Sequence, residues 1–119
     1  MPVREESIGT MALFLLPSLK LKQSGPGGET VETEIHRYLL DTFGGYTAAA
    51  GNIHGFWKDD QGGESYGEHK EYKVGLKDAA RLPELKSFLS RLSAQLEEEC
   101  IYLECGREAL FVYASKSAI

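Results

Sequence analysis

Two segments with helical spacing of apolar residues constrain the fold of this chain most, because strand-like segments flank each of them. The first begins at Thr30, carries acidic residues near its start and ends at Gly44 and Gly45, as the helix dipole and glycine capping favour. The second begins at Pro83, a residue favoured in the first turn of helices. The apolar stripes that should face a sheet are Val31, Ile35, Leu39 and Phe43 in the first helix, and Leu85, Phe88, Leu89, Leu92 and Leu96 in the second.

The segments outside the helices have the composition of strands. Pro17 marks a bend or an edge position in the first strand, and a tight turn around Gly106 and Arg107 joins the last two. The predicted strands span residues 8–22, 46–58, 65–76, 100–104 and 109–115. This order predicts an α+β sandwich of the ferredoxin-like type, in which a βαββαβ unit plus a C-terminal hairpin strand forms one antiparallel sheet with both helices on one face.

The length and the helix arrangement also predict how the chain is organised. At 119 residues it forms a single ferredoxin-like domain, residues 1–119, with loose ends at residues 1–7 and 116–119. Because both helices cover one face of the sheet, the other face remains bare unless another subunit covers it. We therefore expect an oligomer.

The composition argues against several classes of protein. A net charge of -5 and a pI near 5.2 disfavour a nucleic-acid partner, which requires a basic surface, and suit a neutral or cationic ligand instead. The apolar run MALFLLP is too short to cross a bilayer and follows acidic residues, so we expect no membrane segment. Two cysteines, Cys100 and Cys105, are too few for a secreted disulfide scaffold, which favours a cytoplasmic location.

Residues 43–76 concentrate the side chains that can form a site. This stretch holds the only Trp, three of the six Tyr and two of the three His, on two predicted strands joined by a polar, glycine-containing loop. Such a concentration favours a functional hairpin, and the alternative is that the aromatic residues serve a core or an interface.

Nucleophilic and metal chemistry have little support in the sequence. Cys100 opens an apolar strand without a nearby base, as structural cysteines do. The histidines, His36, His54 and His69, lack the paired spacing of a metal site. The glycine-rich segment 24–28 has backbone N–H groups that a phosphate can use, but it lacks the lysine of a nucleotide-binding loop and is more simply a connector. We therefore expect no metal and no cofactor.

Glu68 is the acidic residue whose position is most suggestive. Strand alternation places it on the same side as Tyr72 and the apolar residues that follow, so this carboxylate ends an apolar row. It is either an exposed charge at a strand end or a partly buried acid that awaits a cationic partner. The hairpin also brings Trp57 close to residues 64–68, where it serves a site or, alternatively, a core or an interface.

Taken together, these positions resemble a known enzyme family. The series comprises Gly-Tyr-Thr around Tyr46, a glycine at Gly51, an aromatic residue at Trp57, Glu68 at the opening of a strand, and the segments Glu-Glu-Cys-Ile-Tyr-Leu and Leu-Phe-Val-Tyr-Ala near the end. Over about residues 43–114 this pattern resembles the small phage-encoded S-adenosylmethionine (SAM) lyases. The resemblance implies a PII-like variant of the ferredoxin-like fold and a homotrimer with substrate between subunits.

The resemblance also implies a reaction. Lyases of this family split SAM into methylthioadenosine and homoserine lactone: the carboxylate of the substrate attacks its own γ-carbon and expels the thioether, so no nucleophile, metal or cofactor is required. The protein then has to orient the methionine chain and surround the sulfonium. By position, Glu68 matches the catalytic glutamate, and the substrate-binding residues are Tyr46, Thr47, Trp57, Tyr66 and Tyr72.

Trp57 departs from the family pattern, which has a functional tyrosine at this position. Either the hydroxyl is dispensable, or Tyr66 or Tyr72 supplies one, or the substrate differs. Relatives associated with CRISPR defence cleave an adenylated derivative, SAM-AMP, by the same chemistry. A wider pocket walled by Trp57, with the loop at Gly27 and Gly28 near a phosphodiester, would suit this larger substrate.

Two other kinds of function fit the same sequence. A non-enzymatic PII-like sensor or inhibitor would bind a small ligand or a partner protein through the same cleft as an oligomer. A structural domain without a ligand would leave Tyr46, Trp57 and Glu68 scattered in space.

Overall fold

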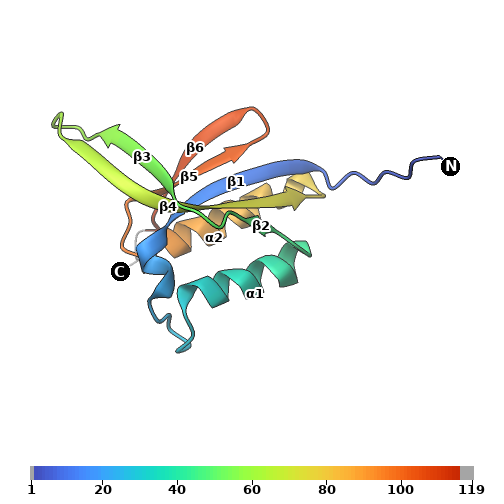
Figure 1. Cartoon of the computed structure of the whole chain (residues 1–119), viewed down its shortest axis with the longest axis horizontal. Coiled ribbons are helices and arrows are strands. Elements are labelled where there is room, and N and C mark those ends of the chain that lie inside the picture. Colours follow the sequence, from blue (N-terminus) through green and yellow to red (C-terminus); the bar gives the residue numbers. More distant parts are fainter. Residues whose placement is uncertain (1, 116–119) are drawn as a thin grey trace.

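The strands form one antiparallel sheet, and both helices lie on the same side of it (Figure 1). The computed structural model describes residues 2–115, so residue 1 and residues 116–119, predicted to be loose, lie outside the described part. Its elements are β1 (Thr10–Pro17), the 3-10 helix η1 (Ser18–Lys22), α1 (Val31–Phe43), β2 (Thr47–Ala48), β3 (Ile53–Lys58), β4 (Glu64–Leu76), the 3-10 helix η2 (Ala79–Arg81), α2 (Leu82–Gln95), β5 (Cys100–Cys105) and β6 (Glu108–Tyr113).

The order of the strands in the sheet is that of a ferredoxin-like fold. The path runs β2-β4-β1-β5-β6, and β3 pairs with the other half of β4. If β2 and β3 are taken as one interrupted strand, the two βαβ halves place β1 and β4 at the centre, and β6 adds the predicted C-terminal strand at the edge. The predicted α+β fold class is confirmed.

The core lies between the sheet and the helices. Alternate residues of β1, β4 and β5 point toward the helices and are buried, and the rings of Phe14 and Tyr72 stack there with centroids 5.4 Å apart. The helical stripes meet them as predicted, since Val31, Ile35 and Leu39 of α1 are fully buried. Each large apolar side chain buried in this way contributes about 1.5–3 kcal/mol.

Both helices begin and end close to the predicted residues. The side chain of Thr30 accepts a hydrogen bond from the Thr33 N–H and caps α1. Gly44, with φ of 83°, ends this helix in the left-handed conformation that glycine adopts easily. The second helix begins at Leu82 and has Pro83 in its first turn.

The first strand is shorter than predicted. It begins at Thr10 because Gly9 has a φ of 84° and lies so close to the Leu76 carbonyl that a side chain would collide with it. It ends at Pro17, whose ring nitrogen cannot donate to the sheet, and the following five residues form η1. Leu21 of η1 is buried in the core, which compensates for leaving the sheet.

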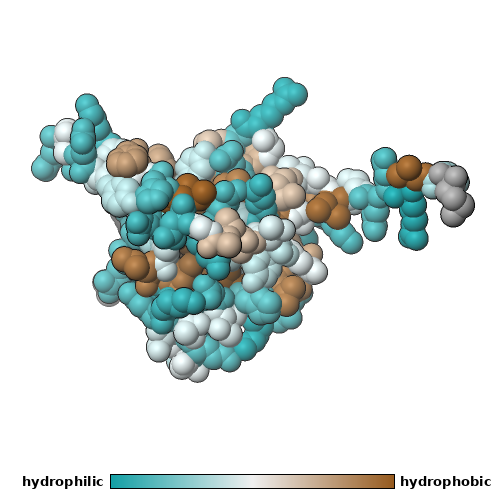
Figure 2. Space-filling view, viewed as in Figure 1, coloured by the Kyte–Doolittle hydropathy of each residue, from teal (hydrophilic) through white to brown (hydrophobic). Residues whose placement is uncertain are grey.

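The strand predicted over residues 46–58 is divided into β2 and β3. Ala48 pairs with Tyr72, and Ile53 pairs with His69, so five residue steps on one strand face three on β4. Two residues therefore bulge out between the paired segments. Beyond this bulge the β3–β4 hairpin extends past β1 and projects from the body of the protein (Figure 2).

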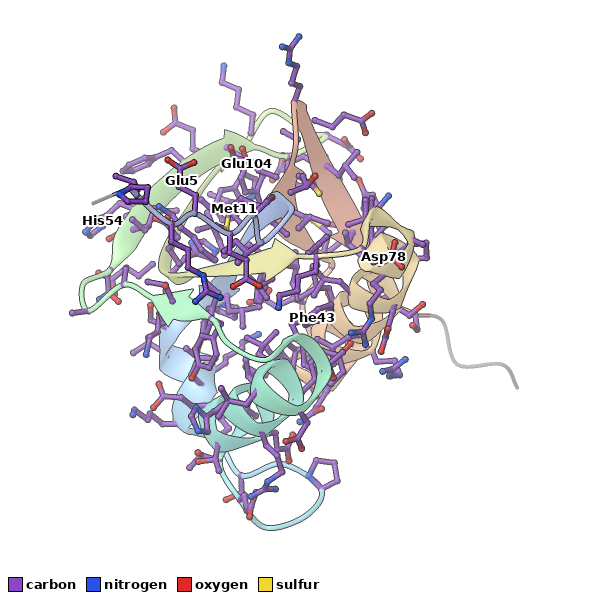
Figure 3. The ribbon with its side chains drawn as sticks, turned by 90° about the vertical axis from the view of Figure 1, so that its right-hand side faces the viewer. Glu5, Met11, Phe43, His54, Asp78 and Glu104 are labelled. Carbon is purple, nitrogen blue, oxygen red and sulfur yellow. The ribbon has the colours of Figure 1, made fainter. Side chains whose placement is uncertain are left out.

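The face of the sheet opposite the helices, called the open face below, carries exposed apolar side chains. Strand alternation and pairing place Met11, Leu13, Leu15, Tyr102, Phe111 and Tyr113 on it. Met11, Phe111 and Tyr113 are each about half exposed or more. In Figure 3, Met11 and Glu104 lie on the side of the sheet away from α1.

Within the described residues, no helix has the length and hydrophobicity to span a bilayer.

Candidate functional site

The helix-facing side of β4 carries a row of polar and aromatic side chains that begins in the hairpin and ends in the core. Alternation places Tyr66, Glu68, Lys70 and Tyr72 on this side, and the burial of Tyr72 and the contact of Lys70 with Glu32 of α1 confirm the direction. The row extends over about 20 Å, because a strand rises about 3.3 Å per residue.

Glu68 lies in the hairpin part of this row and has two polar neighbours on the same face. The Tyr66 hydroxyl donates to its Oε1 at 3.0 Å. His54 stands directly across from Glu68 on β3, and its Nδ1 is hydrogen-bonded to the Tyr66 hydroxyl. The rings of Phe56 and His54 both lie against Tyr66, with centroids 5.1 and 5.6 Å away. Partial desolvation and the bond to Glu68 raise the pKa of Tyr66, which keeps its proton.

Beside the row, a shallow groove of about 260 Å³ lies between α1 and β4. Glu32, Thr33, His36, Tyr46, Lys70 and Tyr72 line it. His36 Nδ1 and the Tyr46 hydroxyl are 2.7 Å apart, and the two rings meet edge to face. Tyr46 also leans on Tyr72 at a centroid distance of 5.8 Å, so aromatic rings form one wall and the floor.

Glu32 organises the charges of the groove. Its carboxylate accepts from Lys22 at 3.0 Å and from Lys70 at 3.3 Å. The hydrogen bond from Lys22, followed by that from Lys70, lowers the pKa of Glu32, so this carboxylate is ionised. Two ammonium groups and one carboxylate leave this end of the row with a net positive charge, whereas the Glu68 end is acidic.

Tyr72 at the floor of the groove has a hydroxyl that finds no hydrogen-bond partner among residues 2–115. The residue is 1% exposed, and burial raises its pKa strongly, with Glu32 contributing in the same direction. The group is therefore a neutral phenol that can still donate and accept. A buried polar atom without a partner is unfavourable, so a ligand group that reaches it gains a hydrogen bond at little competing cost.

Trp57 and Thr47 lie on the open face instead. Trp57 pairs with Ser65, which places its indole beside Gly55 and Gly67 and 6.1 Å from the His69 ring. Thr47 pairs with Lys73. Of the residues predicted to form the site, the structure thus brings together Tyr46, Tyr66, Glu68 and Tyr72 on one face and separates Trp57 and Thr47 from them.

Several residues of this row and groove were not predicted from the sequence: His54, His36, Lys70 and Glu32. The pairing of His54 with Glu68 follows from the length of the hairpin loop, which the sequence leaves open. His36 and Glu32 lie one helical turn apart on α1, a spacing that places them on one face.

The glycine segment 24–28 folds back on itself through a hydrogen bond from Gly25 N–H to the Glu29 carbonyl, as in a connector. Within residues 2–115 no three His, Cys, Asp or Glu side chains gather as a metal site would require.

Comparison with known proteins adds information about the fold. No protein-family model matches the chain, and no curated protein matches it. A phage SAM lyase in the apo state is similar in structure, with a TM-score of 0.62 at 10% identity over 99% of this chain and 100% of that one. A phage SAM lyase in complex with S-methyl-5'-thioadenosine gives a TM-score of 0.57 at 10% identity over 96% of each chain. The resemblance found in the sequence thus extends to the structure, and the chain shares its fold with phage SAM lyases over nearly its whole length.

Proposed function

We propose that this protein is a lyase that cleaves SAM, or its adenylated derivative SAM-AMP, into methylthioadenosine or its AMP adduct and homoserine lactone. The observation that carries the proposal is the position of Glu68, a carboxylate held by Tyr66 on the same face of β4 as the aromatic groove. The fold, shared with phage SAM lyases, supports it as an analogy.

The proposed reaction needs little chemistry from the protein. A carboxylate oxygen of the substrate forms a bond to its γ-carbon while the bond from that carbon to sulfur breaks, and the electron pair leaves on a neutral thioether. No proton is transferred. The task of the protein is to hold the methionine chain bent and to stabilise the charges around the sulfonium, which a fixed carboxylate such as Glu68 does by electrostatic attraction.

The two ends of the row suit the two ends of such a substrate. The sulfonium fits beside Glu68, with the rings of Tyr66 and Phe56 next to it. The adenine fits the groove, against Tyr46 and above the free hydroxyl of Tyr72, about 13 Å along the strand from Glu68. At about 260 Å³ the groove is smaller than the 300–1,000 Å³ or so of sites that enclose a small molecule, so another surface has to complete it.

That surface is proposed to come from a neighbouring copy in a homotrimer. Exposed apolar side chains on the open face, among them Met11, Phe111 and Tyr113, favour burial against other subunits. In such an assembly, Trp57 and Thr47 reach a ligand only in a site shared with another chain. We also propose a cytoplasmic location, where thiols such as those of Cys100 and Cys105 stay reduced.

The positive charge at the groove bears on the choice between the two substrates. Lys22 and Lys70 retain N–H donors beyond those given to Glu32, and a phosphodiester is a suitable acceptor. The loop at Gly27 and Gly28 precedes the same helix and has open space around both residues. These features favour SAM-AMP over SAM as the better substrate.

Incubation of the purified protein with SAM, and separately with SAM-AMP, tests the proposal. We expect methylthioadenosine or its AMP adduct together with homoserine lactone. Glu68→Gln should lower kcat by about 100-fold or more at an unchanged oligomeric state, whereas the matched control Glu64→Gln, farther along the same strand, should not. Binding of either compound without turnover would instead support the PII-like sensor, a function that the open, uncovered groove of a single chain also fits.

A further inference from the structure

We propose that His54 is a positioning residue that acts through Tyr66 to hold the carboxylate of Glu68 in place. The proposal deepens the lyase function and rests on it for its kinetic part. It concerns a residue to which the sequence pattern assigned no role, on strand β3, which projects with β4 from the body of the protein (Figure 1).

The register of the hairpin brings the three side chains together. His54 pairs with Glu68 across the strands, and Tyr66 lies two residues before Glu68 on the same face. His54 Nδ1 contacts the Tyr66 hydroxyl, and this hydroxyl lies 3.0 Å from Glu68 Oε1. The three groups thus form a hydrogen-bonded series from imidazole to phenol to carboxylate.

The direction of these bonds follows from the number of protons. An ionised carboxylate accepts only, so the single hydroxyl proton of Tyr66 points to Glu68. The phenol oxygen then has to accept from His54, and this requires a hydrogen on Nδ1. The series therefore selects one of the two neutral tautomers of His54, the one protonated on Nδ1.

The surroundings of Tyr66 show why it needs His54 to hold its side chain in place. Tyr66 is 51% exposed, and β3 is the one strand of the described part of the chain that pairs with this part of β4, because β1 reaches only to His69. A side chain in such a place loses rotamer freedom only if its neighbours hold it. His54 holds Tyr66 in two ways, by its hydrogen bond to the hydroxyl and by stacking its ring on the Tyr66 ring.

Protonation of His54 changes the charge of the site without breaking the series. The imidazolium keeps its donor at Nδ1 and adds a positive charge beside Glu68. Tyr66 and Glu68 face it from β4, with Glu64 and Lys70 farther along the same face, and Lys58 lies four residues away on its own strand. The added charge opposes binding of a sulfonium.

Kinetics of three variants at pH 8 test the proposal. His54→Asn places an amide N–H near the position of Nδ1, so it should keep more activity than His54→Ala. His54→Gln, whose amide lies near the position of Nε2, is the matched control and should resemble His54→Ala, with kcat about tenfold below the wild type.

The tautomer of His54 gives a readout that needs no turnover. Nitrogen-15 NMR of the free protein near pH 8 should show the Nδ1–H form, and Tyr66→Phe should shift the population toward the commoner Nε2–H form. Nε2–H in the wild type, or no response to Tyr66→Phe, overturns the proposal. Nδ1–H with no turnover of either substrate leaves the positioning of Glu68 intact and rejects the lyase function instead.

Discussion

Trp57 and Glu68 lie on opposite faces of the β3–β4 hairpin. Trp57 pairs with Ser65, and Glu68 pairs with His54, so an odd number of strand positions separates them and the two side chains project in opposite directions. A single chain therefore cannot enclose one ligand between these two residues. If both serve the same site, each acts in a site completed by another subunit.

The first prediction follows from this separation. Trp57→Ala should weaken the association of subunits, because a large aromatic residue on the open face is of the kind that contributes about 2 kcal/mol or more to interfaces. Sedimentation velocity over a range of concentrations measures the effect. Phe56→Ala, on the opposite face of the same strand and 77% exposed, is the comparison and should weaken association less than Trp57→Ala does. An unaltered oligomer with lost ligand binding in Trp57→Ala would place the indole in the ligand pocket only.

The second prediction concerns the free hydroxyl of Tyr72. Tyr72→Phe removes a buried group without a partner, so the unliganded protein should be equally stable or more stable by up to about 1 kcal/mol in urea unfolding. Its affinity for methylthioadenosine should fall several-fold, because the ligand loses this hydrogen bond. Tyr46→Phe, which breaks the contact with His36, is the comparison and should cost about 1 kcal/mol. Marked destabilisation by Tyr72→Phe would mean that the hydroxyl has a partner in the protein.

The third prediction concerns Gly67, over which two rings lie. A Cβ there would be 2.6 Å from His69 Cε1 and 3.0 Å from Trp57 Cη2, so both rings must move in Gly67→Ala. We expect a loss of about 1–3 kcal/mol and a red shift in the fluorescence of the single Trp. In Gly55→Ala the nearest Trp57 atom would be at an ordinary 3.4 Å from the new Cβ. This substitution should therefore change the stability and the fluorescence much less. Equal effects of the two substitutions would contradict this packing.

The fourth prediction concerns acid. Burial lowers the pKa of His69, although Glu98 acts in the opposite direction. The unfolded chain therefore binds a proton at this residue at a higher pH than the folded chain does, and stability should decrease as the pH falls through about 6.5 toward the lower folded pKa. Urea unfolding at pH 7.5 and at pH 5 measures the loss, and His69→Gln should reduce it. A loss of equal size in His69→Gln would assign the acid sensitivity to other groups.

The sequence predicted those features that depend on local periodicity. The stripes of α1 and α2, the cap at Gly44 and the alternation of Glu68 with Tyr72 all follow from the spacing of residues along one element. Features that depend on how strands pair could not be predicted from the sequence. The face of Trp57 and the partner of Glu68 are set by the turn in which Asp59 N–H donates to the Gly63 carbonyl, and nothing in its composition specifies that register.

The two residues that bulge out between β2 and β3 carry a further consequence. Because their number is even, alternation continues through the bulge from Ala48 to His54, and the two side chains face the same side of the sheet. The turn at Asp59 and Gly63 fixes the register of β3 on β4, so deleting one residue from the segment 49–52 should leave His54 opposite Glu68 and Trp57 on the open face. The bulge should then shrink to one residue, and β2 is the strand whose pairing has to adjust.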